Sequence, residues 1–63
     1  MNLDENIDSI INNLINGNRN DALNQFRDMN PLHAAYAAVL VMENESVTAE
    51  NKRWLMNALY NGK

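Results

Sequence analysis

Few residues in this chain have side chains that could carry out catalytic chemistry. His33 is the only histidine and the natural candidate for a general base, and the hydroxyl groups of Ser9, Ser46 and Thr48 are the candidate nucleophiles. Covalent or acid–base catalysis needs a nucleophile or substrate within hydrogen-bond reach of a base that a third group orients. Nothing in the spacing of these residues indicates such an arrangement. We therefore predict no catalytic residue and no enzymatic activity, and interpret the hydroxyls as helix-surface or capping groups.

Metal and cofactor sites are disfavoured by a shortage of ligands. The chain has no cysteine and one histidine, which excludes a structural zinc site built from those residues. The acids near the start, Asp4, Glu5 and Asp8, are more simply explained as a solvated first turn, where the helix dipole favours negative charge. There is no glycine-rich loop of the kind that holds phosphate groups. The sequence predicts neither a metal site nor a bound cofactor.

The charge of the chain argues against binding to nucleic acid. Eight acidic residues outnumber five basic ones, which gives a formal charge of −3. Binding to nucleic acid depends mainly on Lys and Arg side chains that neutralise phosphates. The basic residues here are scattered and form no stripe: Arg19, Arg27, Lys52, Arg53 and Lys63. We expect no nucleic-acid partner, and eight acids are also too few for a protein that imitates nucleic acid.

A group of residues near the C-terminus has the types that are enriched at protein interfaces. The group consists of Arg53, Trp54, Met56 and Tyr60. Trp, Tyr, Met and Arg are over-represented at interfaces, and Trp, Tyr and Arg among the residues that dominate binding energy. We name these four residues as a candidate interaction site. The alternative is that Trp54, as the largest aromatic of a small chain, belongs to the core.

Four helices would have to position these residues. Apolar residues recur at spacings of three and four, and turn signals divide the chain into helices at 3–16, 21–29, 31–43 and 48–60. Asn2 is the expected cap of the first helix, and Gly17 is the expected left-handed residue that ends it. Asn30 and Pro31 separate the second helix from the third, because the residue before proline avoids the α region. The sequence predicts an all-α bundle of four short helices.

The third predicted helix has two apolar sides. From Pro31 to Met42 it carries no formal charge apart from a proton on His33. One side consists of Leu32, Tyr36, Val39 and Leu40, and the other consists of the small residues Ala34, Ala37, Ala38 and Val41. A helix that is apolar on both sides must be covered on both sides. Either the rest of the chain supplies both covers, or a partner supplies one, and we name the small residues as the candidate dimer face.

The length of the chain also favours association. Sixty-three residues are enough for one domain, placed at 1–63, whose core supplies no more than about 3–5 kcal/mol. A second copy would add buried surface, so we expect a homodimer. The longest apolar run covers eleven residues from Leu32 to Met42, about half of what a membrane-spanning helix needs. Since the start also lacks a cationic signal segment, we expect a cytoplasmic protein without membrane contact.

One local pattern resembles a known repeat family. The spacing Gly17-Asn18-x-x-x-Ala22-x-x-x-Phe26, followed by Pro31, resembles the turn and second helix of a tetratricopeptide repeat. The resemblance implies a glycine in the turn, a small residue that allows close helix packing, and an aromatic that packs one turn later. The proline comes about one turn early, the repeat's first-helix pattern is missing, and no second copy follows. We therefore interpret the segment as an ordinary tight helical hairpin.

The chain as a whole resembles another group of proteins in size and composition. With its acidity, its thirteen asparagines and its lack of cysteine, it is similar to the short accessory or host-modulating proteins of temperate phages and mobile elements. Such a protein would bind and modulate a host or phage protein. We therefore predict a non-catalytic protein–protein interaction module. The alternative is a small DNA-binding regulator with a helix-turn-helix, although no predicted helix carries more than two basic residues.

Overall fold

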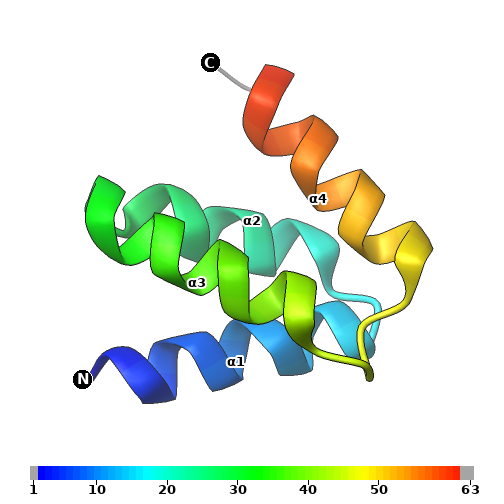
Figure 1. Cartoon of the computed structure of the whole chain (residues 1–63), viewed down its shortest axis with the longest axis horizontal. Coiled ribbons are helices and arrows are strands. Elements are labelled where there is room, and N and C mark those ends of the chain that lie inside the picture. Colours follow the sequence, from blue (N-terminus) through cyan, green and yellow to red (C-terminus); the bar gives the residue numbers. More distant parts are fainter. Residues whose placement is uncertain (1, 62–63) are drawn as a thin grey trace.

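The computed structural model describes residues 2–61, so that Lys63 lies outside the described part of the chain. Four helices follow one another: α1 (Leu3–Ile15), α2 (Arg19–Asp28), α3 (Pro31–Glu43) and α4 (Ala49–Asn61) (Figure 1). Residues 2–61 contain no strand. The predicted all-α architecture of four short helices is confirmed, and each predicted helix end lies within two residues of the observed one.

Helix α1 begins and ends with the local interactions that the sequence predicts. The Asn2 side chain accepts a hydrogen bond of 2.9 Å from the backbone N–H of Glu5, which satisfies one of the free donors of the first turn. At the other end Gly17 has a φ of +86°. The N–H of Asn18 donates to the carbonyl of Asn13 at 2.7 Å, which is the hydrogen bond that defines a Schellman ending.

Helices α2 and α3 meet at the Asn30–Pro31 pair. Helix α2 begins at Arg19, two residues before the predicted start, and Asn18 precedes it without a capping side-chain hydrogen bond. Helix α3 begins at Pro31, and the Asn30 side chain accepts a hydrogen bond of 3.0 Å from the N–H of His33. Proline needs no hydrogen-bond partner at the first helical position, which is why the pair can end one helix and begin the next.

Helix α4 is reached through a short loop that contributes to the core. The side chain of Asn44 accepts a hydrogen bond of 2.8 Å from the N–H of Ser46, which turns the chain. Val47 is buried in this loop. The Thr48 hydroxyl then accepts a hydrogen bond of 3.1 Å from the N–H of Asn51 and caps α4.

The four helices are not arranged symmetrically. Helices α1 and α2 form an antiparallel hairpin, α3 runs in the direction of α1, and α4 leaves at an angle to the other three (Figure 1). The main packed pairs are α1 with α2, α1 with α3, α2 with α3, and α2 with α4. The radius of gyration is 10.4 Å, about the value expected of a compact chain of this length.

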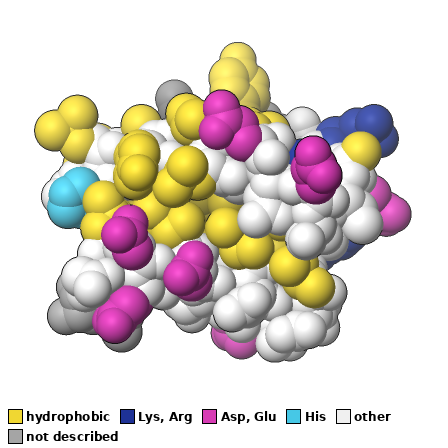
Figure 2. Space-filling view, turned by 60° about the horizontal axis from the view of Figure 1, so that its bottom comes forward, with side chains coloured by type: hydrophobic (Ala, Val, Ile, Leu, Met, Phe, Trp, Pro, Cys, Tyr) yellow, Lys and Arg dark blue, Asp and Glu magenta, His cyan; other side chains and the backbone are white. Residues whose placement is uncertain are grey.

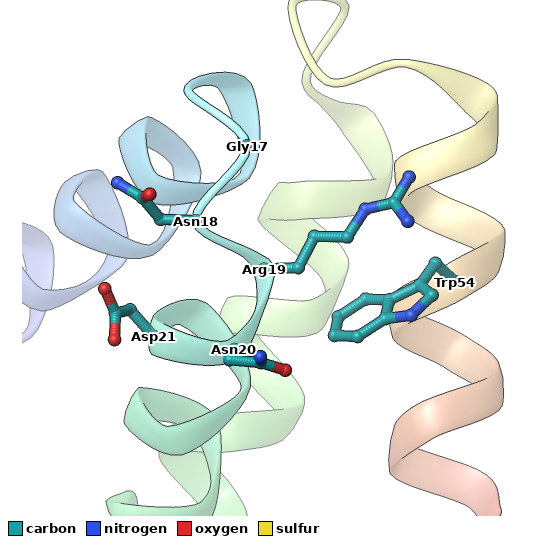
Figure 3. Close-up of a pocket in the computed structure, with 6 residues that line it drawn as sticks. All are labelled: Gly17, Asn18, Arg19, Asn20, Asp21 and Trp54. Carbon is teal, nitrogen blue, oxygen red and sulfur yellow. The ribbon is translucent and has the colours of Figure 1, made fainter.

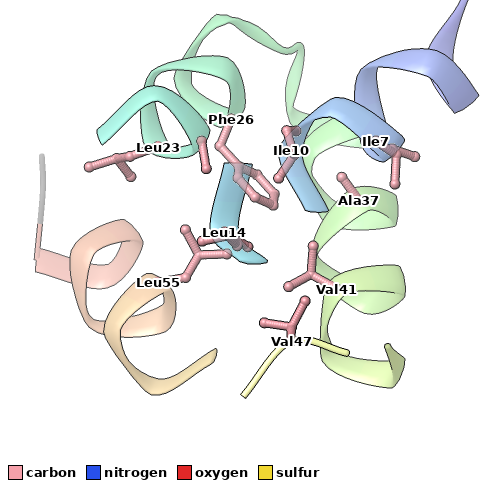
Figure 4. Packing of buried hydrophobic residues seen from close by; sticks show 10 residues of the cluster. Ile7, Ile10, Leu14, Leu23, Phe26, Ala37, Val41, Val47 and Leu55 are labelled. Atoms are coloured by element: carbon pink, nitrogen blue, oxygen red, sulfur yellow. The ribbon is translucent and has the colours of Figure 1, made fainter. Parts of the chain in front are cut away.

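Ten hydrophobic residues form the buried core (Figure 4). They are Ile7, Ile10, Leu14, Ala22, Leu23, Phe26, Ala37, Val41, Val47 and Leu55. Helices α1 and α2 contribute three each, α3 contributes two, and α4 contributes one. The hairpin of α1 and α2 therefore supplies most of the core, and the uncharged helix α3 supplies only Ala37 and Val41.

Polar side chains also join α1 to α2. The Asn13 amide donates to the Gln25 side-chain oxygen at 2.8 Å, and the Gln25 amide donates to the Ser9 hydroxyl at the same distance. In the core between the two helices, Ala22 is fully buried and Phe26 is nearly so. Both residues belong to the core that joins α1 to α2.

Candidate functional site

Helix α3 exposes one side that is made of large apolar residues. Leu32 is 82% exposed, Val39 53% and Tyr36 48%. Their spacing of four and then three residues places them on one stripe of the helix. These three residues are referred to below as the α3 stripe. Single exposed apolar residues are ordinary on a protein surface, but several on one helix face indicate a surface that binds something.

The opposite side of α3, which the sequence names as the candidate dimer face, packs against the rest of the chain. Ala37 and Val41 are fully buried in the core (Figure 4), and Ala34 and Ala38 are half-buried against it. Small side chains allow α3 to lie close to the α1–α2 hairpin, so the chain itself covers this side. Ala37 and Val41 are fully buried, so the large apolar residues that α3 exposes are those of the α3 stripe.

The surroundings of the α3 stripe are acidic. Figure 2 shows hydrophobic side chains gathered over one face of the molecule, with Asp and Glu side chains around them. Helix α3 contains no Lys or Arg, and its acid is Glu43 at the C-terminal end. Helix α1 also has no Lys or Arg, and it carries Asp4, Glu5 and Asp8. All four acids are exposed.

The beginnings of α1 and α3 lie side by side. Asn6 of α1 and His33 of α3 line the same small hollow of about 280 Å³, together with Gln25, Asp28, Met29 and Asn30. The one carboxylate that lines this hollow is Asp28 of α2, and Glu5 and Asp8 are exposed on α1 on either side of Asn6 in the sequence. His33 is exposed, and its Nδ1 atom lies 3.3 Å from the amide nitrogen of Asn30. Neither the Asn30 contact nor the lining of the hollow places a nucleophile beside His33, as a catalytic base would need.

The predicted interaction site on α4 is divided between two flanks of the helix. Arg53 is exposed and Tyr60 is 83% exposed, whereas Trp54 and Met56 are half-buried. Two positions apart on an α-helix are separated by roughly 200°, so Trp54 and Met56 point in different directions. Trp54 faces the start of α2. The spacing of three and then four residues places Arg53, Met56 and Tyr60 on one face of α4, and Trp54 lies on the flank that faces α2.

Trp54 is held by a polar junction that the sequence did not indicate. The guanidinium carbon of Arg19 lies 5.4 Å from the centre of the Trp54 ring (Figure 3), a distance at which a cation is attracted to an aromatic face. The Arg19 Nε donates to the Asn51 side-chain oxygen at 2.8 Å, and the Asn51 amide donates to the Leu14 carbonyl at 3.1 Å. Arg19 also lies 3.7 Å from the exposed carboxylate of Glu50. Residues far apart in sequence make this junction, so no local pattern could have revealed it.

An open hollow of about 550 Å³ adjoins the same junction. It is lined by Gly17, Asn18, Arg19, Asn20, Asp21 and Trp54 (Figure 3). The lining offers amides, one carboxylate and a guanidinium that is already paired, and it contains neither a nucleophile nor a histidine. Among residues 2–61, no three His, Cys, Asp or Glu side chains are grouped so that they could hold a metal ion.

Comparison with protein families, with curated proteins and with solved structures finds no match for this chain. Within residues 2–61, no helix has the length and apolar character needed to cross a lipid bilayer. The surface itself is therefore the basis for a functional proposal, and the α3 stripe is its most distinctive feature.

Proposed function

We propose that this chain is a non-catalytic protein-binding module, and that its binding surface is the α3 stripe. The observation that carries the proposal is the exposure of Leu32, Tyr36 and Val39 on one face of a helix whose other face is buried. Removing a side chain of this size from water contributes about 1.5–3 kcal/mol. A tyrosine is also one of the residue types that most often dominate the energy of an interface.

The α3 stripe is a better binding surface than the α4 group named from the sequence. On α4 the exposed Arg53 and Tyr60 are accompanied by Trp54, which already packs against the core, and by the half-buried Met56. On α3 the three exposed residues extend over two turns without an intervening charge. A partner that packs there desolvates apolar surface and leaves no buried charge unpaired.

The DNA-binding alternative gains no support from the placement of the basic residues. Arg19 is engaged with Trp54, Asn51 and Glu50. Of the other described basic residues, Arg27 lies on α2, and Lys52 and Arg53 lie on α4. A protein that binds and modulates a host or phage protein also agrees with the chain's resemblance to phage accessory proteins.

A quantitative pulldown tests the proposed surface. Immobilised wild-type protein is compared with a Leu32→Gln/Val39→Gln variant and with an Arg53→Ala/Tyr60→Ala variant, in lysate from cells of the source organism. All of the substituted residues are exposed, so each variant keeps the fold, which circular dichroism checks. A protein retained by wild type and by the α4 variant, but lost from the α3 variant, supports the proposal. Loss from the α4 variant alone, or equal retention by all three, overturns it.

A further inference from the structure

The described basic residues of this molecule are confined to two of its four helices, whereas acids occur on all four. Helices α1 and α3 together carry the acids Asp4, Glu5, Asp8 and Glu43, and neither helix has a Lys or Arg. The described basic residues all lie on α2 or α4, at Arg19, Arg27, Lys52 and Arg53. The α3 stripe is therefore an apolar strip on the part of the molecule that has acids and no cations. Figure 2 shows acidic side chains standing around the hydrophobic ones on this face.

We infer that the partner of the α3 stripe is an amphipathic helix with Lys and Arg residues beside its apolar face. This inference rests on the proposed function, because it names the partner of the same surface. The three stripe residues span seven positions, about 10 Å along a helix axis. An opposing helix with apolar residues at i, i+3 or i+4, and i+7 presents a stripe of the same length and direction.

The acids of α1 and α3 favour a partner helix that is positively charged. Asp4, Glu5 and Asp8 are exposed on α1, the helix whose Asn6 lines a hollow with His33 of α3. Glu43 is exposed at the end of α3, four residues after Val39, and so continues the α3 stripe. Lys and Arg flanking the partner's apolar face would meet these carboxylates, and opposite charges at the rim of an interface steer association and suppress wrong partners.

A second copy of this chain is a poor occupant of the same surface. In a two-fold dimer the same patch meets itself. Two α3 stripes in contact would bring the acids of α1 and α3 together from both copies, with no Lys or Arg on either helix to offset them. Like charges facing each other across an interface are unfavourable. The charge pattern that attracts a basic helix therefore opposes self-association through the α3 stripe.

Two synthetic peptides test the inference directly. Both are amphipathic helices of about 18 residues with the same leucine face, and one carries Lys on its flanks where the other carries Glu. Binding to 15N-labelled protein is followed by NMR, which also shows which amides respond. We expect the Lys peptide to bind and to perturb amides of α3 and of the start of α1. Its affinity should fall about fivefold or more when salt is raised from about 50 to about 500 mM. We expect the Glu peptide not to bind.

Matched variants separate the charge from the apolar surface. An Asp4→Asn/Asp8→Asn variant should bind the Lys peptide several-fold more weakly and with less salt dependence. An Asp21→Asn/Glu50→Gln variant removes two acids at the beginnings of α2 and α4 instead, and should bind as wild type does. The Leu32→Gln/Val39→Gln variant should lose binding.

Each other outcome overturns the inference in a recognisable way. Equal binding of both peptides through Leu32 and Val39 would show that charge does not select the partner, while the proposed surface would stand. Binding of the Lys peptide that survives Leu32→Gln/Val39→Gln would refute both the inference and the proposed surface. Failure of both peptides to bind, whether the protein is a monomer or a dimer, would also overturn the inference. The pulldown would still test the proposed function independently.

Discussion

Asn51 connects three parts of the chain through one side chain. Its amide oxygen accepts the hydrogen bond from Arg19 at the start of α2, and its amide nitrogen donates to the carbonyl of Leu14 near the end of α1. The Leu14 carbonyl also accepts a hydrogen bond of 3.4 Å from the N–H of Gly17, so Asn51 adds a second donor to it from α4. An amide is suited to this position because it offers an acceptor and a donor at once.

Replacing Asn51 by alanine should lower the free energy of unfolding by about 1–3 kcal/mol, since two part-buried hydrogen bonds are lost. Asn57→Ala is the matched control, because Asn57 is exposed on the same helix and the change in helix propensity is the same. The control should change stability by no more than about 0.5 kcal/mol. Urea denaturation followed by circular dichroism measures both, and equal effects would show that the junction does not stabilise the fold.

At the scale of the helices, α3 shows how two apolar sides can have different roles. The small side packs within the chain, and the large side is exposed apart from Leu40, which is half-buried against the core. Ala35 and Ala37 are a natural comparison, because Ala35 is exposed and Ala37 is fully buried on the same helix.

Ala37→Leu should destabilise the protein by about 1–3 kcal/mol, because a core without room for the larger side chain must shift to accept it. Ala35→Leu adds the same atoms at the surface and should change stability by less than about 0.5 kcal/mol. Thermal and urea unfolding of the two variants provides the measurement. If Ala37→Leu were as well tolerated as Ala35→Leu, the small side of α3 would not be the buried one.

Helix α4 depends on few buried side chains. Leu55 is its one fully buried residue among those described, and Trp54, Ala58 and Leu59 pack half-buried around the core. This is a weaker attachment than those of α1 and α2, which contribute three core residues each.

Leu55→Ala should cost about 2–5 kcal/mol, and the amides of α4 should lose protection from hydrogen exchange before those of the α1–α2 hairpin. Tyr60→Ala, at a residue that is 83% exposed, should leave the exchange pattern unchanged. Residue-resolved exchange measured by NMR separates the two. Simultaneous loss of protection in all four helices would contradict the weak attachment of α4.

The helices were predictable from sequence because local interactions determine their ends. Asn2, Asn30 and Thr48 cap the helices that follow them, and Gly17 has the positive φ that a glycine supports after a helix. Which side of α3 is buried was not predictable, because both sides are apolar and the choice depends on the shape of the α1–α2 hairpin. The Arg19–Trp54 contact was equally hidden, because it joins residues from two helices that only the tertiary fold brings together.

At the scale of the whole molecule, the chain combines a small core with described basic residues that lie only on α2 and α4. Ten buried residues support the fold, and a core in a chain of this length supplies about 3–5 kcal/mol. The size of the core alone favours a homodimer. The exposed acids of α1 and α3 oppose association through the α3 stripe, so we expect the free protein to resist association through this surface.

Sedimentation should therefore show one species of 7.2 kDa at low salt. Association through the α3 stripe should require high salt, because added ions screen the repulsion between the acids of the two copies. Salting-out ions such as sulfate should promote it further, because they also strengthen apolar burial. Leu32→Gln/Val39→Gln should abolish any such association. A dimer that is stable at low salt and persists in this variant would contradict the expectation.

The stacking of Arg19 on Trp54 also gives the protein a built-in optical probe. Trp54 is the single tryptophan, and its indole ring lies where α4 meets the start of α2, under the guanidinium (Figure 3). Separation of α4 would expose the ring to water and shift its emission to longer wavelength. A ligand on α3 touches neither partner of the stack. Fluorescence and ligand binding therefore report on different parts of this molecule, so that a partner's arrival and the opening of α4 can be followed separately in one sample without any added label.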